Sequence, residues 1–311
     1  MTRSVPTFFL LFSLAATLAA RQDQPRPRLL QYNFTAEQQL SYTLQNDMDI
    51  NETDVPQGTP RQRAGSVAHT MEYAVGVDSG GTGGVPAVLR VKIRRYTVSD
   101  GNPDHDFDSA NASQMAAAKT SAGCGWCAAT ISSISTVEVM QDGKIGKVRL
   151  LDFDTGYGET VGSVLNKVVD EVSHYIAFPL STQAVSAGQS WTGAVPVKFL
   201  GGPLSGNFFE LPGRFQLERT GEISGEKVAW ITISLASQPR LDLTEESVRD
   251  ARLEFHVDHL NGTAVFSLDR GVLVQYEVAA GTHIQVTVGN QTLDDHKMEY
   301  RIRVTRTGSP R

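Results

Sequence analysis

The residues best suited to chemistry are two cysteines, Cys124 and Cys127, which lie three positions apart in the sequence Gly-Cys-Gly-Trp-Cys. Two thiols at this spacing can form a reversible disulfide, and a helix N-terminus can stabilise one of them as a thiolate. Here the pair instead follows a short predicted helix over 110–119, where the negative end of the helix dipole disfavours a thiolate. We therefore expect a local disulfide between them in an oxidising compartment, with a secreted thiol oxidoreductase as an alternative function.

Two Asp-Ser/Thr-Gly triplets, beginning at Asp78 and Asp154, resemble the paired motifs of aspartic proteases, in which two carboxylates share a proton. The chain between them is too short for a two-lobed protease, and Tyr157 stands where those enzymes have a small residue. Asp, Ser and Gly are also the usual residues of turns. The triplets are therefore interpreted as turns, and no catalytic residue is assigned.

Metal ligation is also not expected. The alternating acidic run from Asp100 to Asp108 lacks the Gly and Glu of an EF-hand loop, so it is interpreted as a solvated acidic loop. His256 and Asp258 share one face of a predicted strand and His259 lies on the other face, so a metal there would need ligands from neighbouring strands. The sequence predicts no cofactor.

Charge disfavours a nucleic-acid partner. The formal net charge is −6, and the basic residues Arg90, Lys92, Arg94 and Arg95 alternate with apolar ones as on the wet face of a strand.

The N-terminus predicts export. Residues 1–20 combine Arg3, an apolar run and two small residues, which is the layout of a secretory signal peptide. No later stretch reaches the roughly 20 apolar residues that a membrane-spanning helix needs. We expect residues 21–311 to form a soluble domain in a periplasm or outside the cell.

Period-two hydrophobic patterns predict antiparallel strands over most of that domain. The runs start at Leu253, Ala264, Val272, Ile284 and Met298, with turns expected at Asp269-Arg270-Gly271 and at Ala280-Gly281. An Asp142-Gly143 turn predicts a further hairpin. Arg95 interrupts the alternation of its own run, which predicts a bulge. Because the hairpins resemble each other, two related halves over 30–155 and 178–307 are proposed.

One segment has helical periodicity instead. Apolar residues three or four apart between Val161 and Ile176 predict an amphipathic helix over 160–177 that joins the two halves. The shorter helix over 110–119 is expected to be capped by Asp108 or Ser109.

Several short motifs follow one another in a familiar order. They are Phe107-Asp108-Ser109, the Asp142-Gly143 hairpin, the apolar helix, Phe178-Pro179-Leu180 and Val185-Ser186-Ala187-Gly188-Gln189-Ser190-Trp191. In these the chain resembles an uncharacterised family of exported bacterial proteins. The resemblance implies a half-barrel similar to the lipoprotein carriers LolA and LppX, and it brings no catalytic residues. The insertion that holds the two cysteines departs from the family pattern.

The sequence thus predicts a mainly β (α+β) fold: a strongly curved antiparallel sheet or incomplete β-barrel with one long amphipathic helix in its concave side. A non-enzymatic binding function fits such a hollow, with a lipid, another apolar ligand or an envelope protein as partner. A structural or adaptor module with a filled core is the alternative. The expected lining of the cavity consists of Val164, Leu165, Val168, Val172, Phe255, Phe266 and Tyr276.

Overall fold

The computed structural model describes residues 27–54, 61–102, 106–120, 125–152, 172–198, 208–239, 251–288 and 291–308. Its main element is one antiparallel sheet of twelve strands. The strands of the N-terminal half are β1 (Gln39–Asp54), β2 (Arg61–Ser79), β3 (Ala87–Ser99), β4 (Phe107–Asp108), β5 (Ile134–Val139) and β6 (Ile145–Asp152). Those of the C-terminal half are β7 (Ser190–Lys198), β8 (Phe208–Ile223), β9 (Glu226–Leu235), β10 (Ala251–Ser267), β11 (Val272–Val288) and β12 (Gln291–Arg306).

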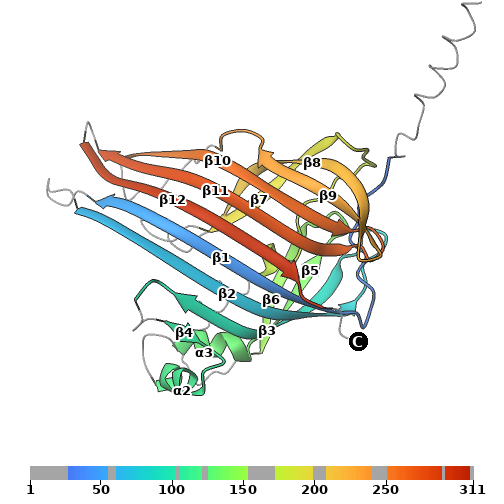
Figure 1. Cartoon of the computed structure of the whole chain (residues 1–311), viewed down its shortest axis with the longest axis horizontal. Helices are drawn as coiled ribbons and strands as arrows, with labels where there is room; N and C mark the ends of the chain where they lie inside the picture. Colours follow the sequence, from blue (N-terminus) through green and yellow to red (C-terminus); the bar gives the residue numbers. More distant parts are fainter. Residues whose placement is uncertain are drawn as a thin grey trace, which may run out of the picture.

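The order of the strands explains the shape of the sheet. Strands adjacent in sequence pair in an up-and-down pattern, and the first long strand, β1, also pairs with the last, β12. The full order is β6-β5-β3-β2-β1-β12-β11-β10-β9-β8-β7, with the short β4 beside β3. Figure 1 shows the sheet curving so that β5, β6 and β7 lie behind the long central strands. In the described part of the chain the sheet is not closed, and β6 and β7 are its two edges.

Alternating side chains build the concave face, as the period-two pattern predicted. Register places Leu44 of β1 between Met71 of β2 and Val304 of β12, and all three are buried. On the opposite, convex face the same strands carry polar residues, such as Asp47 and Arg301. The structure thus confirms a curved antiparallel sheet with one apolar face.

The predicted hairpin turns differ in outcome. Gly143, between β5 and β6, and Gly271, between β10 and β11, have positive φ angles of 82° and 61°, which confirms both turns. The turn predicted at Ala280-Gly281 is wrong, because β11 runs straight through it. A Cβ atom on Gly281 would lie 2.6 Å from Cε1 of His259 and 2.7 Å from Oε1 of Glu299. Glycine is therefore needed at this position because side chains on the two neighbouring strands lie too close for a Cβ atom.

The bulge predicted at Arg95 is confirmed. The register of β2 and β3 shifts between the pairs Glu72–Arg95 and Tyr73–Ile93, so Arg94 is the extra residue. The shift lets Arg95 stay on the outer face while Tyr96 returns to the core.

The described helices are short: α2 (Ala112–Thr120) and α3 (Gly125–Ser132) pack beside β3 and β4 (Figure 1). The helix predicted over 110–119 is therefore present, but its cap is neither Asp108 nor Ser109. Asn111 caps it, because its Oδ1 accepts bonds from the backbone N–H groups of Ser113 (3.1 Å) and Gln114 (3.3 Å). Most of the helix predicted over 160–177 lies outside the described residues; of the described part, 172–174 are helical and 175–177 are not. The predicted signal peptide 1–20 also lies outside them.

Candidate ligand-binding hollow

Aromatic side chains fill the hollow at the end of the sheet that holds the turns of Gly143 and Gly271, here called the turn end. Phe178 lies at their centre. Its ring centroid is 6.0 Å from that of Phe215, 6.1 Å from Tyr276 and 6.3 Å from both Tyr32 and Phe266. All of these side chains are buried, and burial raises the pKa of Tyr32 and of Tyr276 above the usual tyrosine range. The phenols are therefore neutral, and this end of the core is packed.

Two segments outside the long strands, 28–34 and 172–185, hold this cluster in place and are called the plug. The phenol oxygen of Tyr32 accepts a hydrogen bond from the backbone N–H of Phe178 at 2.9 Å. The backbone N–H groups of Tyr32 and Leu180 donate to the carbonyls of Gln141 (2.8 Å) and Asp142 (2.8 Å) in the β5–β6 turn, and Asn33 N–H donates to Gly271 (2.9 Å). The plug thus fastens a turn from each half of the chain and closes the turn end.

Beyond the plug, the concave face continues toward the opposite end, where β1 and β11 finish, here called the far end. Successive cross-strand rows bring Met48 of β1 beside Tyr300 and Val67, and then Ile50 beside Met298. Met48, Met298 and Tyr300 are buried, whereas Ile50 and Val67 are partly exposed. The main strand contacts of the described helices are those of α3 with β3 and of α2 with β4. The apolar side of the sheet therefore continues well beyond the aromatic cluster.

Polar side chains also lie on this face, one pair between the Leu44 and Met48 rows and a histidine nearer the far end. Asn46 and His69, which are cross-strand partners on β1 and β2, are 1% and 7% exposed. His296 of β12 is 1% exposed, and its Nε2 lies 3.8 Å from Oε1 of Glu52 on β1. The concave face is therefore apolar at the plug and mixed from the Asn46–His69 pair onward.

The residues predicted to line a cavity fall in different places. Phe266 and Tyr276 belong to the aromatic cluster, and Val172 is buried in the plug. Phe255 of β10 is partly buried and packs against the core from the half of the strand nearer the far end. Val164, Leu165 and Val168 lie outside the described residues. The structure thus brings Phe266 and Tyr276 together, and their role in a cavity stays a prediction.

Sequence reasoning missed the plug residues that matter most here. The alternation of Leu30, Tyr32 and Phe34 follows the same period of two as the strands, and all three are buried. Phe178 was noted only as part of a motif. Its signal was the apolar Tyr175 to Phe178 run followed by Pro179, which ends a helix and lets an extended segment enter the core.

A groove of about 460 Å³ lies between the two edges of the sheet, next to the plug. Its walls are Ile145, Gly146 and Val148 of β6 on one side and Thr192, Ala194 and Pro196 of β7 on the other. Plug residues, including Ala177 and Leu180, form its floor. The groove marks the place where the curved sheet fails to close.

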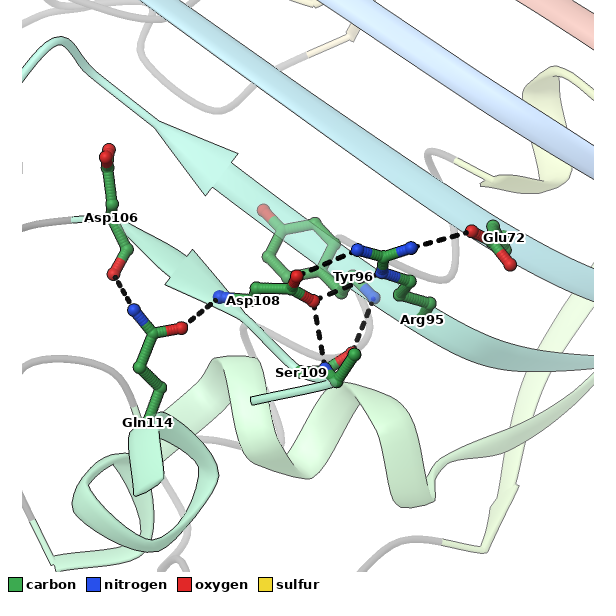
Figure 2. Close-up of polar contacts among 8 residues, drawn as sticks. Glu72, Arg95, Tyr96, Asp106, Asp108, Ser109 and Gln114 are labelled. Atoms are coloured by element: carbon green, nitrogen blue, oxygen red, sulfur yellow. Dashed lines mark hydrogen bonds and ion pairs between the residues drawn. The ribbon is translucent and has the colours of Figure 1, made fainter. Parts of the chain in front are cut away.

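A polar network fastens β4 and α2 to the bulge of β3 (Figure 2). Arg95 donates from Nε and Nη2 to the two carboxylate oxygens of Asp108, at 3.1 and 2.8 Å, and its Nη1 lies 3.5 Å from Glu72. The Gln114 side chain accepts from the backbone N–H of Asp108 at 2.8 Å and donates to the carbonyl of Asp106 at 3.3 Å. Since every polar contact shown joins parts of the chain, the network is best explained as structural.

This network predicts a pH effect. The bonds from Arg95, and then that from the Ala110 N–H, hold the pKa of Asp108 below its usual range. A depressed carboxyl pKa stabilises the folded state above the unfolded-state pKa of about 4, and this stabilisation is lost as pH falls through the lower folded-state pKa. We expect the Ser109 amide, which donates to Tyr96 at 3.0 Å, to lose hydrogen-exchange protection on acidification below about pH 4. In Asp108→Asn the protection factor should be lower at neutral pH and insensitive to this range; an unchanged acid response would contradict the assignment.

The histidines of the convex face differ from the sequence-based expectation. The register shift between Val257 and His259 turns His259 to the same face as His256, so the prediction that they occupy opposite faces is wrong. Nε2 of His259 lies 3.3 Å from Glu299, and His283 lies 2.6 Å from Asp295. Within the described ranges, no cluster of three His, Cys, Asp or Glu side chains is placed to hold a metal ion.

The other candidate chemical residues have structural surroundings. Cys127 is fully buried in α3 and is not a free thiol, whereas Cys124 lies outside the described residues, so their pairing stays a prediction. Asp78 accepts a hydrogen bond from Arg90 at 3.0 Å across the strand surface, and Asp154 lies outside the described residues. Asp100 accepts a turn hydrogen bond from the Asn102 N–H at 3.0 Å.

Comparison with known proteins gives structural likeness without a family. No family model matches the chain, and no curated protein matches it in sequence. A structure concerned with lipid–protein interactions in lipovitellin aligns with 89% of the chain at 10% identity and a TM-score of 0.41, and the chain spans 26% of the lipovitellin chain. DynF from the dynemicin pathway of Micromonospora chersina aligns with 91% of the chain and 90% of its own length, at 6% identity and a TM-score of 0.20. The translocator domain of the autotransporter NalP from Neisseria meningitidis aligns with 95% of both chains, at 11% identity and a TM-score of 0.18. These scores are too low to carry function.

No helix in the described ranges is both long enough and apolar enough to cross a membrane.

Proposed function

We propose that this protein is an exported, non-enzymatic binding protein that shelters an apolar ligand, such as a lipid acyl chain, in the hollow of its open sheet. The observation that carries the proposal is the mainly apolar concave face of the central strands, which continues past the plug to Ile50 and Met298 and is interrupted by the Asn46–His69 pair. Binding sites for small molecules are concave, mainly apolar and furnished with a few polar groups.

The geometry also suggests how such a ligand lies. The plug closes the turn end, so an apolar chain would point toward Phe178 and Tyr276. Asn46 and His69 lie midway along the strands, and His296 lies near the far end. An amphipathic ligand therefore fits with its apolar chain toward the plug and its polar group toward the far end, since binding sites combine an apolar lining with a few polar groups.

A fluorescent fatty acid, dansylaminoundecanoic acid, tests the proposal. We expect saturable binding, and Ile50→Gln should weaken it about tenfold, since losing the burial of an aliphatic side chain costs roughly 1.5 kcal/mol. Asn51→Gln is the matched control, because it also introduces glutamine but on the exposed, convex face of β1. It should change the affinity less than about twofold. Absence of saturable binding, together with no lipid in solvent extracts of protein purified from its own host, would remove the proposal.

A structural or adaptor module is the second candidate, and one observation favours it. Phe266 and Tyr276 are 1% and 3% exposed within the packed aromatic cluster, so that half of the hollow is filled by the chain itself. Under this alternative, the protein would co-purify with another envelope protein and carry no lipid. No such observation favours the thiol oxidoreductase alternative, since Cys127 is buried in α3 and Cys124 lies outside the described residues.

A further inference from the structure

The two edges of the sheet are unequal. An edge strand presents unpaired backbone N–H and C=O groups to which another strand can add. Strand β7 contains Pro196, which has no N–H to donate, and proline is tolerated in sheets mainly at such edges. Strand β6 has no proline, and no described strand pairs with its outer side. Of the two edges, β6 is therefore the better template for an added strand.

The two faces of β6 have different chemistry. Val148 and Leu150 pair with the buried residues Val137 and Ser135 of β5, so they lie on the concave side and are partly buried. Lys147 and Arg149 lie on the convex side and are exposed. Leu151, also on that side, is 55% exposed. An added strand would therefore meet apolar side chains on one face and, on the other, Lys147 and Arg149 flanked by Glu138 of β5 and Asp152 at the end of β6.

The groove between the edges continues from the apolar side of β6, and its lining also includes the polar residues His174, Thr192 and Glu210. It begins at Ile145 and Val148, passes over Ala177 and Leu180 of the plug and ends at the β7 edge. Side chains of an added strand that point to the concave side would enter this groove. Cross-strand neighbours on one face lie about 5 Å apart, close enough for apolar contact on one side and ion pairs on the other.

We propose that β6 binds an extended peptide segment of a partner protein, in which acidic and apolar residues alternate. The segment adds to the sheet as a strand, with its apolar side chains in the groove and its acidic side chains beside Lys147 and Arg149. A second copy of this chain fits poorly. Pairing β6 with β6 would set these basic side chains against each other, and β7 of another copy would bring Pro196.

Short synthetic peptides in which valine alternates with glutamate or lysine test this inference. We expect the glutamate peptide to bind at least about tenfold more tightly than the lysine peptide, in a salt-dependent manner. N-methylation of every second backbone nitrogen distinguishes strand addition from simple charge attraction. One methylated set should weaken binding at least about tenfold because its N–H groups face β6, and the other set should change it less than about threefold. Equal binding of the parent and both methylated peptides would overturn the inference.

Charge-reversal variants locate the site. Lys147→Glu/Arg149→Glu should invert the preference to the lysine peptide. Lys92→Glu is the matched control, because Lys92 is an exposed basic residue on β3, whose two sides pair with β2 and β5. The control should leave the preference unchanged. If the double variant still prefers the glutamate peptide, the peptide binds elsewhere and the assignment to β6 is wrong.

Discussion

Phe178→Ala is expected to lower the free energy of unfolding by about 3–5 kcal/mol, the usual cost of removing a buried aromatic ring. The Phe178 ring contacts those of Tyr32, Phe215, Phe266 and Tyr276, which come from the plug and from three different strands. Since the surrounding strands are held by ladder hydrogen bonds, they cannot collapse into the space that the substitution leaves. Urea denaturation followed by circular dichroism measures the loss.

Phe178→Leu provides the comparison. Leucine keeps most of the apolar volume and retains the backbone N–H that donates to Tyr32, so its cost should be clearly smaller than that of alanine. A loss below about 1 kcal/mol for Phe178→Ala would mean that the aromatic cluster does not hold the turn end together, because a packed ring of this size contributes more than that.

The sheet itself could be predicted from the sequence, because its signal is local. One face of each strand is buried and the other is exposed to solvent. Apolar residues therefore recur at every second position, as in Leu40-x-Tyr42-x-Leu44. The bulge at Arg95 was equally local, since a single residue broke the alternation. The resemblance to half-barrel carriers agreed with this, and the open curved antiparallel sheet confirms that level of the prediction.

Glycine shows where local reasoning fails. Gly143 and Gly281 both follow apolar runs, and each suggested a turn. Gly143 has a positive φ angle and lies in a turn, whereas Gly281 lies inside β11, where side chains from two neighbouring strands leave no room for a Cβ. The second reason depends on the strands that flank β11, which the sequence does not identify.

The candidate site was harder to predict for the same reason. The pairing of β1 with β12 joins the two ends of the chain and thereby places the sheet edges at β6 and β7, in the middle of the sequence. No short-range pattern encodes such a contact. Likewise, Tyr32 and Phe178 meet across a long stretch of chain, so the plug could not be assembled from periodicity alone. The helix predicted over 160–177 rests on a strong local period of three to four residues, and most of it lies outside the described residues.

The second large effect is expected at the β5–β6 turn, where Gly143→Ala should destabilise the protein by about 2–5 kcal/mol. Part of this cost is backbone strain. A φ angle of 82° is unfavourable for residues with a Cβ, and the strain amounts to about 1–2 kcal/mol. The rest is steric. A Cβ would collide with the carbonyl oxygen of Phe178 and lie 2.9 Å from Cε2 of Tyr32, so the turn and the plug would have to separate.

Gly188→Ala isolates the steric part of that cost. Gly188 has nearly the same φ angle, 85°, but a Cβ there meets no atom within 4 Å. Its substitution should therefore cost only the backbone strain of about 1–2 kcal/mol. Urea denaturation of both variants gives the difference, and hydrogen exchange at the Leu180 amide, which donates to Asp142 at 2.8 Å, reports the separation directly. Equal destabilisation by the two substitutions would show that the plug is not pressed against this turn, because only Gly143 faces it.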